Sequence, residues 1–135
     1  MRIGANQLAR SAAIRPSELL GSPMLTFDLT AEIERLRKGM LGRATELKTL
    51  VKRADFRSVL IVLKPEARLH EHKAAGRISV QAVAGHIRMH VQDKVIDLPA
   101  GHMLALERAL PHDVEALEDS AFLLTIAWPV DGEKR

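Results

Sequence analysis

The sequence predicts an all-β domain preceded by one short helix, and three observations support this prediction. From residue 45 onward, about eight short segments rich in β-branched and apolar residues recur at a spacing of about 8–12 residues. Turn-forming residues separate them, and no helical periodicity interrupts them. The chain of 135 residues, 47% hydrophobic and 27% charged, has the size and composition of one globular domain.

The chain is expected to have three parts. Residues 1–23 are predicted to form a flexible N-terminal arm, because Pro16 and other helix-breaking residues interrupt them. This segment also resembles a weak transit peptide, and a start of the gene at Met24 would make it an upstream extension. Residues 24–128 are predicted to form the single barrel domain, and residues 129–135 a C-terminal tail.

A short helix is predicted at about residues 30–40. Thr30 is a suitable N-cap, because its hydroxyl can accept a hydrogen bond from a backbone N–H of the first turn. Glu32 lies in that turn, where the helix dipole favours an anion. Apolar residues follow at helical spacing, and Gly39 and Gly42 provide a stop.

Strands are predicted across residues 45–128. The segments, in chain order, are TELKTLV, FRSVLIVL, RISVQAVAGHIRMHV with a turn at Gly85, DKVIDL, HMLALE, DVEAL and AFLLTIAW. Many short strands with regular turns indicate a sandwich or a barrel.

Composition excludes several classes of function. The chain has no cysteine, so disulfides, zinc–thiolate sites and cysteine nucleophiles are absent. Aromatic residues make up 3% and the net charge is +3, which argues against nucleic-acid binding through stacked bases and a clustered basic face. No apolar run is long enough to cross a bilayer, so we expect no membrane partner and a cytoplasmic location.

Histidines occur in a pattern that resembles a known family. His70 and His72 form a His-any-His pair, and Gly85 closes the strand pair that follows. Further on, Gly101 precedes His112 by a characteristic interval. Over Phe56 to Trp128 the sequence resembles small single-domain cupins of the RmlC-like jelly-roll superfamily, of the cupin-2 conserved-barrel type. The resemblance implies a cupin-type double-stranded β-helix, or jelly-roll barrel.

Two features of the family motifs are missing. The glutamate of the first motif would fall at Gly76, Arg77 or Ile78, none of which is acidic. The Pro-any-Gly of the second motif is replaced by Glu107-Arg108-Ala109.

The resemblance implies a metal centre made of three histidines. Residues two apart in a strand share one face, so His70 and His72 can point into the barrel, where His112 would complete the set. Imidazole nitrogens suit one divalent ion such as iron, zinc, nickel or manganese. Activity by resemblance would be dioxygenase-like or isomerase-like. The alternative is a metal-free barrel that binds or senses a small molecule.

A small-molecule ligand is expected inside the barrel. The predicted pocket residues are Arg77, Ile78, Val80, Met89 and Met103. Arg77 could hold a carboxylate or phosphate of the ligand, or lie outside and pair with Glu71 or Asp113. The apolar residues would otherwise be ordinary barrel core.

A homodimer is also expected, because sheets with free edges commonly pair with a second copy. The outward face of FRSVLIVL or of GHIRMHV would form the contact.

Overall fold

The computed structural model describes residues 23–129, apart from the side chains of Glu71 and His72. The predicted arm and tail lie outside this range except for their residues 23 and 129. One helix and nine strands are described: α2 (Leu29–Lys38), β1 (Thr45–Lys52), β2 (Phe56–Leu63), β3 (Arg68–His72), β4 (Arg77–Ala84), β5 (His86–Val91), β6 (Lys94–Pro99), β7 (Met103–Leu106), β8 (His112–Ala116) and β9 (Ser120–Ala127). None of the described residues belongs to a helix with the length and apolar character of a membrane span.

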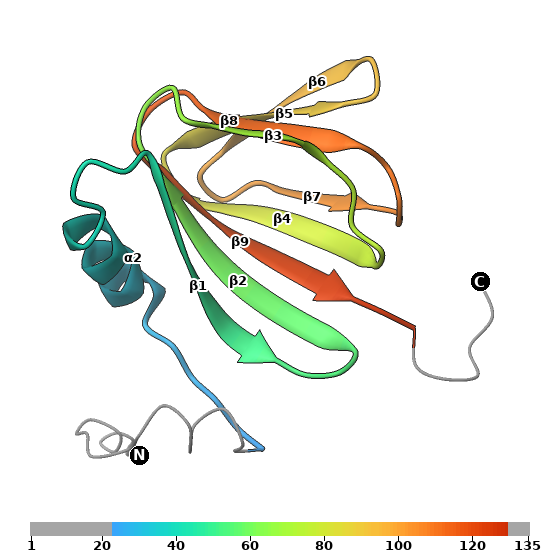
Figure 1. Ribbon diagram of the computed structural model, residues 1–135, viewed down its shortest axis with the longest axis horizontal. Coiled ribbons are helices and arrows are strands. Elements are labelled where there is room, and N and C mark those ends of the chain that lie inside the picture. The colour runs from blue at the N-terminus through green and yellow to red at the C-terminus, as the bar shows by residue number, and fades with distance from the viewer. Residues whose placement is uncertain (1–22, 130–135) are drawn as a thin grey trace.

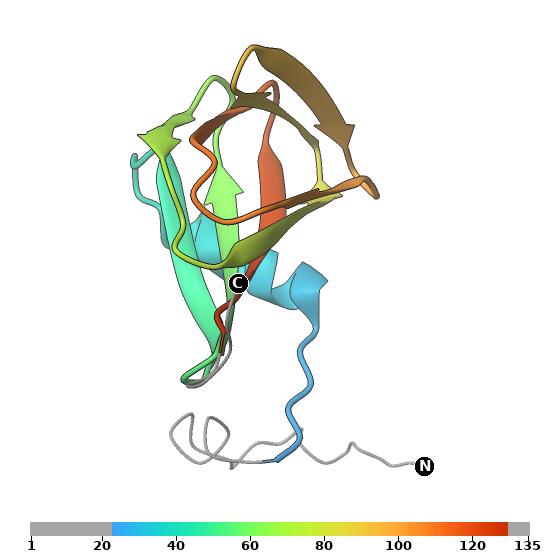
Figure 2. The same cartoon turned by 90° about the vertical axis from the view of Figure 1, so that its right-hand side faces the viewer.

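The strands form two antiparallel sheets that face each other (Figure 1). One sheet has the order β1-β2-β9-β4-β7 and the other the order β3-β8-β5-β6. A quarter turn of the molecule shows the strands enclosing a common interior (Figure 2). The predicted all-β jelly-roll barrel with a short N-terminal helix is therefore confirmed.

Alternation along β2 explains how one strand serves two cores. Val59 and Ile61 point between the sheets and join the barrel interior. Leu60 and Val62 point the other way and pack with residues of α2. Fully burying such a side chain is worth about 1.5–3 kcal/mol, so this apolar strand stabilises both layers.

The helix begins and ends slightly earlier than predicted. Its N-cap is Asp28 and not Thr30, because the Asp28 carboxylate accepts a hydrogen bond of 3.1 Å from the Ala31 backbone N–H. Lys38 is its last residue and Gly39 its C-cap. Aspartate is as effective an N-cap as serine and a better one than threonine, and Asp28 precedes Thr30 by two residues.

Helix α2 covers the outer face of β1 and β2. Ile33 and Met40 pack against Leu60 and Val62 in a second buried cluster. The protein's own helix thus covers the outward face of FRSVLIVL at Leu60 and Val62, and this part is not available for the expected dimer contact. The homodimer itself stays a prediction.

An ion pair fixes the same helix to β1. Glu32 accepts hydrogen bonds of 2.9 Å from Lys48 Nζ and from Arg35. Burial raises the pKa of the Glu32 carboxyl, but these hydrogen bonds and the charges of Lys48 and Arg35 together lower it by more, so the pKa lies below its ordinary value. The helix is thus held by apolar contacts and by charge.

Three positions of the glycine motifs, Gly85, Gly101 and Ala109, have a left-handed backbone. Gly85 closes the β4–β5 turn with φ +78°, and a Cβ there would lie 2.1 Å from the Asp119 carbonyl oxygen. Ala109 has φ +67° and occupies the place of the second motif's glycine. The fold therefore keeps the glycine conformation at residue 109 without the glycine.

Candidate functional site

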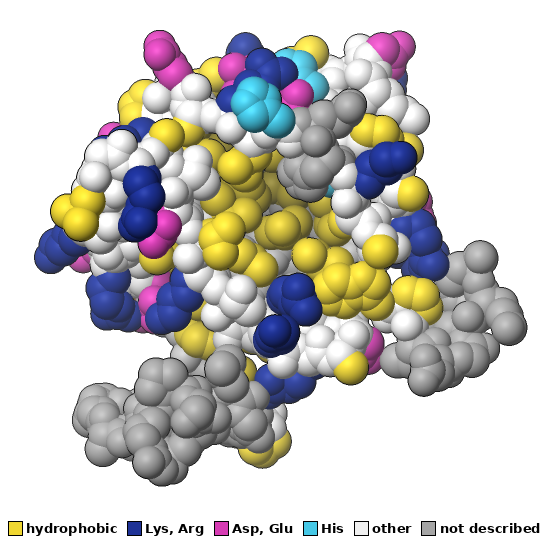
Figure 3. Space-filling view, viewed as in Figure 1, with side chains coloured by type: hydrophobic (Ala, Val, Ile, Leu, Met, Phe, Trp, Pro, Cys, Tyr) yellow, Lys and Arg dark blue, Asp and Glu magenta, His cyan; other side chains and the backbone are white. Residues whose placement is uncertain are grey.

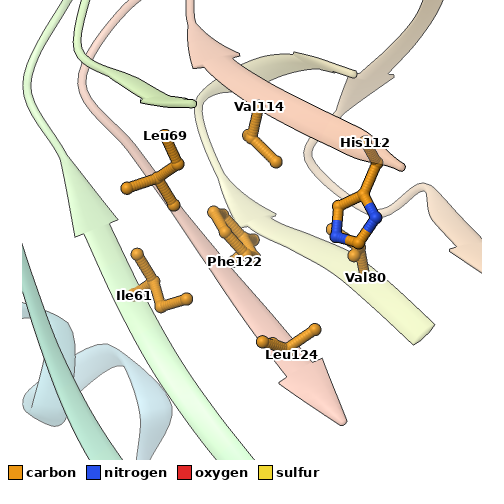
Figure 4. Close-up of a pocket in the computed structure, with 7 residues that line it drawn as sticks. All are labelled: Ile61, Leu69, Val80, His112, Val114, Phe122 and Leu124. Carbon is orange, nitrogen blue, oxygen red and sulfur yellow. The ribbon is translucent and has the colours of Figure 1, made fainter. Parts of the chain in front are cut away.

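A small cavity lies between the two sheets and is partly open to the surface. Its volume is about 20 Å³, which is enough for a water molecule or an ion but not for a whole organic ligand. The lining residues come from both sheets and are Ile61, Leu69, Val80, His112, Val114, Phe122 and Leu124 (Figure 4). The space-filling view shows an apolar hollow with basic side chains at its lower rim (Figure 3). His112 is the polar residue of this lining.

His112 is held in a defined orientation. It is the first residue of β8, and only 3% of it is exposed. Its Nδ1 lies 2.9 Å from the Leu110 carbonyl oxygen. A carbonyl can only accept, so Nδ1–H donates, and in the neutral ring Nε2 carries the lone pair. A metal-binding histidine has the same arrangement, with one nitrogen hydrogen-bonded to a carbonyl and the other left basic.

The three predicted metal ligands are not placed alike. The backbone of His72 pairs directly with that of His112 across β3 and β8. His70 is exposed, and its neighbour Leu69 lines the cavity in its place. The cause is an irregularity in the β3–β8 pairing between Leu69 and His72, where two residues of β3 face one of β8. That extra residue breaks the simple alternation on which the His-any-His prediction depended.

The site fits a metal in part. His112 is oriented as a ligand, and His72 is opposite it in the sheet. Among the side chains that the structure describes, which do not include that of His72, no three His, Asp or Glu groups lie close enough to hold an ion. The three-histidine set stays a prediction.

The apolar residues predicted around the ligand divide into three groups. Val80 lines the cavity. Ile78 and Met89 are buried in the barrel core, but they are not among the cavity residues. Met103 is 61% exposed, so its predicted place in the pocket is wrong. Met103 begins β7, an edge strand of its sheet, and it pairs with the exposed Gln81 of β4.

Arg77 makes an ion pair at the surface. Its Nε donates a hydrogen bond of 2.8 Å to Glu107, and both side chains are exposed. Glu107 lies on the loop after β7, so this partner is neither of the two that were expected. An exposed ion pair of this kind contributes at most about 1 kcal/mol and leaves Arg77 outside the cavity lining.

Sequence reasoning missed Arg57. Its guanidinium carbon lies 5.1 Å from the centre of the Trp128 ring, a cation–π distance. Its Nε is buried, and no hydrogen-bond acceptor reaches that atom within the described part of the chain. An unsatisfied buried donor costs roughly 1–3 kcal/mol. The signal in the sequence was strand alternation, which places Arg57 on the same side as Val59 and Ile61.

The outer face of the second sheet carries a network of charges. Asp113 accepts hydrogen bonds from Arg68 at 2.8 Å and from His90 Nδ1 at 2.7 Å. Partial burial raises the pKa of the Asp113 carboxyl, but these hydrogen bonds and the charges of Arg68 and His90 together lower it by more, and the net pKa is below its ordinary value. The histidines of GHIRMHV therefore belong to this outer network and not to the cavity, as their alternation predicted.

Comparison with solved structures identifies the fold. A cupin-2 domain protein from Shewanella frigidimarina superposes with a TM-score of 0.63 at 14% identity, over 76% of this chain and 94% of that one. An RmlC-like cupin from Desulfovibrio desulfuricans gives 0.60 at 25% identity, over 65% and 86%. A variant of oxalate decarboxylase from Bacillus subtilis gives 0.52 at 25% identity, over 54% and 21%. No protein-family model and no curated protein matches the sequence.

Proposed function

This chain has the fold of a small cupin-domain protein, and we propose that it binds a divalent metal ion and a small molecule at the His112 end of its barrel. The observation that carries the proposal is His112 itself. It is a buried histidine on an apolar cavity, and a backbone carbonyl holds its ring so that Nε2 is the basic nitrogen.

The proposed metal ligands are His72 and His112, with His70 as the third ligand that the resemblance implies. His70 is exposed here, so its ring would have to turn inward to take part. A bound divalent ion would act as a Lewis acid toward a carbonyl or carboxylate group of the ligand. The reactions expected from the resemblance are dioxygenase-like or isomerase-like.

The chain's own residues would position the ligand. The cavity excludes all but a very small group, because Phe122, Leu124 and Val114 close it from several sides. A larger ligand would therefore place only one end in the cavity and leave the rest at the mouth. Apolar walls around one basic nitrogen favour a ligand with an apolar part next to a polar one.

A metal-free binding module is the second candidate, and the composition of the cavity favours it. The described lining contains no carboxylate, and a site without an acid holds hard divalent ions weakly. In that case His112 Nε2 would accept a hydrogen bond from the ligand.

Metal content separates the two candidates. Protein purified without a polyhistidine tag, and loaded in turn with iron, zinc, nickel and manganese, is analysed for bound metal after desalting. We expect about one ion per chain in the wild type, lost in His72→Ala and in His112→Ala. His102→Ala is the matched control, because His102 is an exposed turn residue.

Two outcomes refine or reject the proposal. Loss of metal in His70→Ala would identify His70 as the third ligand, whereas retention would reduce the protein ligands to His72 and His112. Wild-type protein that retains none of the four metals would reject the metal site and leave the metal-free module.

A further inference from the structure

Arg57 lies on the interior side of its strand, one step outside the cavity. Its backbone pairs with Ile126 of β9, two residues beyond the cavity residue Leu124. The neighbouring pair, Ser58 and Thr125, has its hydroxyls 3.5 Å apart on the opposite side of the sheet. Arg57 therefore continues the inward row of Val59 and Ile61 toward the end of the barrel.

The same end of the barrel carries His112. In the close-up, His112 lies beside Val80 and on the side of the cavity toward which β9 runs (Figure 4). Val80 pairs with Leu124 across β4 and β9, and the following residues of β9 lead to Ile126. Arg57 on one sheet and His112 on the other thus belong to one mouth.

The guanidinium of Arg57 differs from other arginines of the barrel in what surrounds it. Arg68, Arg77 and Arg88 each donate to a carboxylate at 2.8 or 2.9 Å. For Arg57 the neighbour is the Trp128 ring, and its buried Nε has no acceptor among residues 23–129. At this distance the Trp128 ring attracts the guanidinium through its π face, and no carboxylate is paired with Arg57 among the described residues.

We propose that Arg57 binds the carboxylate of a small ligand at the mouth of the barrel. The inference rests on the proposed function in taking the cavity as the ligand site, and it adds the chemical class of the ligand. A carboxylate accepts two parallel hydrogen bonds from a guanidinium, which gives an arginine at the mouth a preference for this group. The apolar part of a short ligand would lie between Arg57 and His112, next to Leu124 and Ile126, because the cavity itself has room for only about 20 Å³.

The test compares an acid with its neutral analogue of the same size. Butanoate and butanamide are titrated by calorimetry into metal-free wild-type protein and into Arg57→Met and Arg77→Met. We expect the wild type and Arg77→Met to bind butanoate and not butanamide. Arg57→Met should bind butanoate at least about tenfold more weakly, since it loses the charge and the paired donors. Arg57→Gln replaces Arg57→Met should the methionine variant fail to fold.

Several results would overturn the inference: no binding of butanoate to wild type, equal binding of butanamide, unchanged binding in the Arg57 variant, or loss in Arg77→Met. Binding of inorganic phosphate in place of butanoate would also overturn it, since the ligand class would be wrong. Because the experiment uses metal-free protein, its outcome is independent of the metal analysis. The two proposals can therefore fail separately.

Discussion

His72 and His112 are directly opposed across the antiparallel strands β3 and β8, and His112 Nδ1 donates to the Leu110 carbonyl at 2.9 Å. The Cα atoms of opposed residues in such a pair are about 4.5–5.5 Å apart. The fold thus brings the backbones of two histidines from distant parts of the chain next to each other, and the side chain of His112 lines the cavity. It keeps this pairing although one residue is inserted in β3 between Leu69 and His72.

Because of that inserted residue, alanine substitutions at Leu69 and at His70 should lower the free energy of unfolding by different amounts. Leu69 lines the cavity and packs on the barrel core, whereas His70 is exposed. Leu69→Ala should lower the free energy of unfolding by about 1–3 kcal/mol, because the side chain is only partly buried. His70→Ala should change it by less than about 0.5 kcal/mol. Urea unfolding of both variants checks this, and a larger loss in His70→Ala would contradict the assigned register of β3.

Gly85 and Gly101 both have a positive φ, but replacing them with alanine should lower the stability of the fold by different amounts. At Gly85 a Cβ would meet the Asp119 carbonyl oxygen at 2.1 Å and Ser120 Oγ at 2.5 Å. At Gly101, with φ +93°, nothing lies within 4 Å of such a Cβ. Gly101→Ala should cost about 1–2 kcal/mol from the backbone alone, and Gly85→Ala clearly more because the β4–β5 turn must also shift. Equal melting temperatures of the two variants would show that the close approach at Gly85 is not real.

At Ala109 the opposite substitution, from alanine to glycine, should raise the stability of the fold. Its φ of +67° is costly for alanine and neutral for glycine, and its N–H donates to the Ala74 carbonyl at 2.9 Å, which fixes the loop. Ala109→Gly should therefore raise the free energy of unfolding by up to about 1 kcal/mol, less the extra entropy of glycine in the unfolded chain. Chemical denaturation measures the change, and a marked loss of stability would contradict the left-handed conformation.

The lowered pKa of Asp113 predicts a dependence of stability on pH. A carboxyl whose folded pKa is depressed stabilises the fold above its unfolded pKa of about 3.9, and this stability is lost as the pH falls through the folded pKa. Asp113→Asn should be less stable than wild type at pH 7 by about 0.5–1 kcal/mol, and the difference should shrink below about pH 4.

Denaturant titrations at pH 7 and in acid test this expectation, with the exposed Asp93→Asn as control. A difference between Asp113→Asn and wild type that stays constant into acid would mean that the ion pairs with Arg68 and His90 contribute nothing.

The fold could be predicted because its signals are local. Strand alternation and turn residues in the sequence indicated an all-β sandwich or barrel. The cupin-type jelly roll was implied by the resemblance of His70, His72, Gly85 and His112 to the family motifs. The helix was placed one or two residues late, because Asp28 and Thr30 are both good caps and the choice depends on docking against the sheet.

The site was harder to predict because it depends on pairing between distant strands. The inserted residue in β3 depends on how β3 pairs with β8, and the sequence around His70 contains no residue pattern that indicates it. The partner of Arg77 is Glu107, which is 30 positions away in the chain. The position of Arg57 was predictable from the sequence. Alternate residues of FRSVLIVL share one face of the strand, so Arg57 lies on the same side as Val59 and Ile61.

The state of the His112 ring tests the proposed site most directly. Nitrogen-15 NMR of the histidine side chains, with the His112 signals assigned by comparison with His112→Gln, reports which ring nitrogen carries the proton. At a pH where the ring is neutral we predict the Nδ1–H form, with the Nε2 resonance moving when zinc is added. An Nε2–H ring, or an Nε2 resonance that zinc leaves unchanged, would contradict the proposal that His112 is a metal ligand in the barrel.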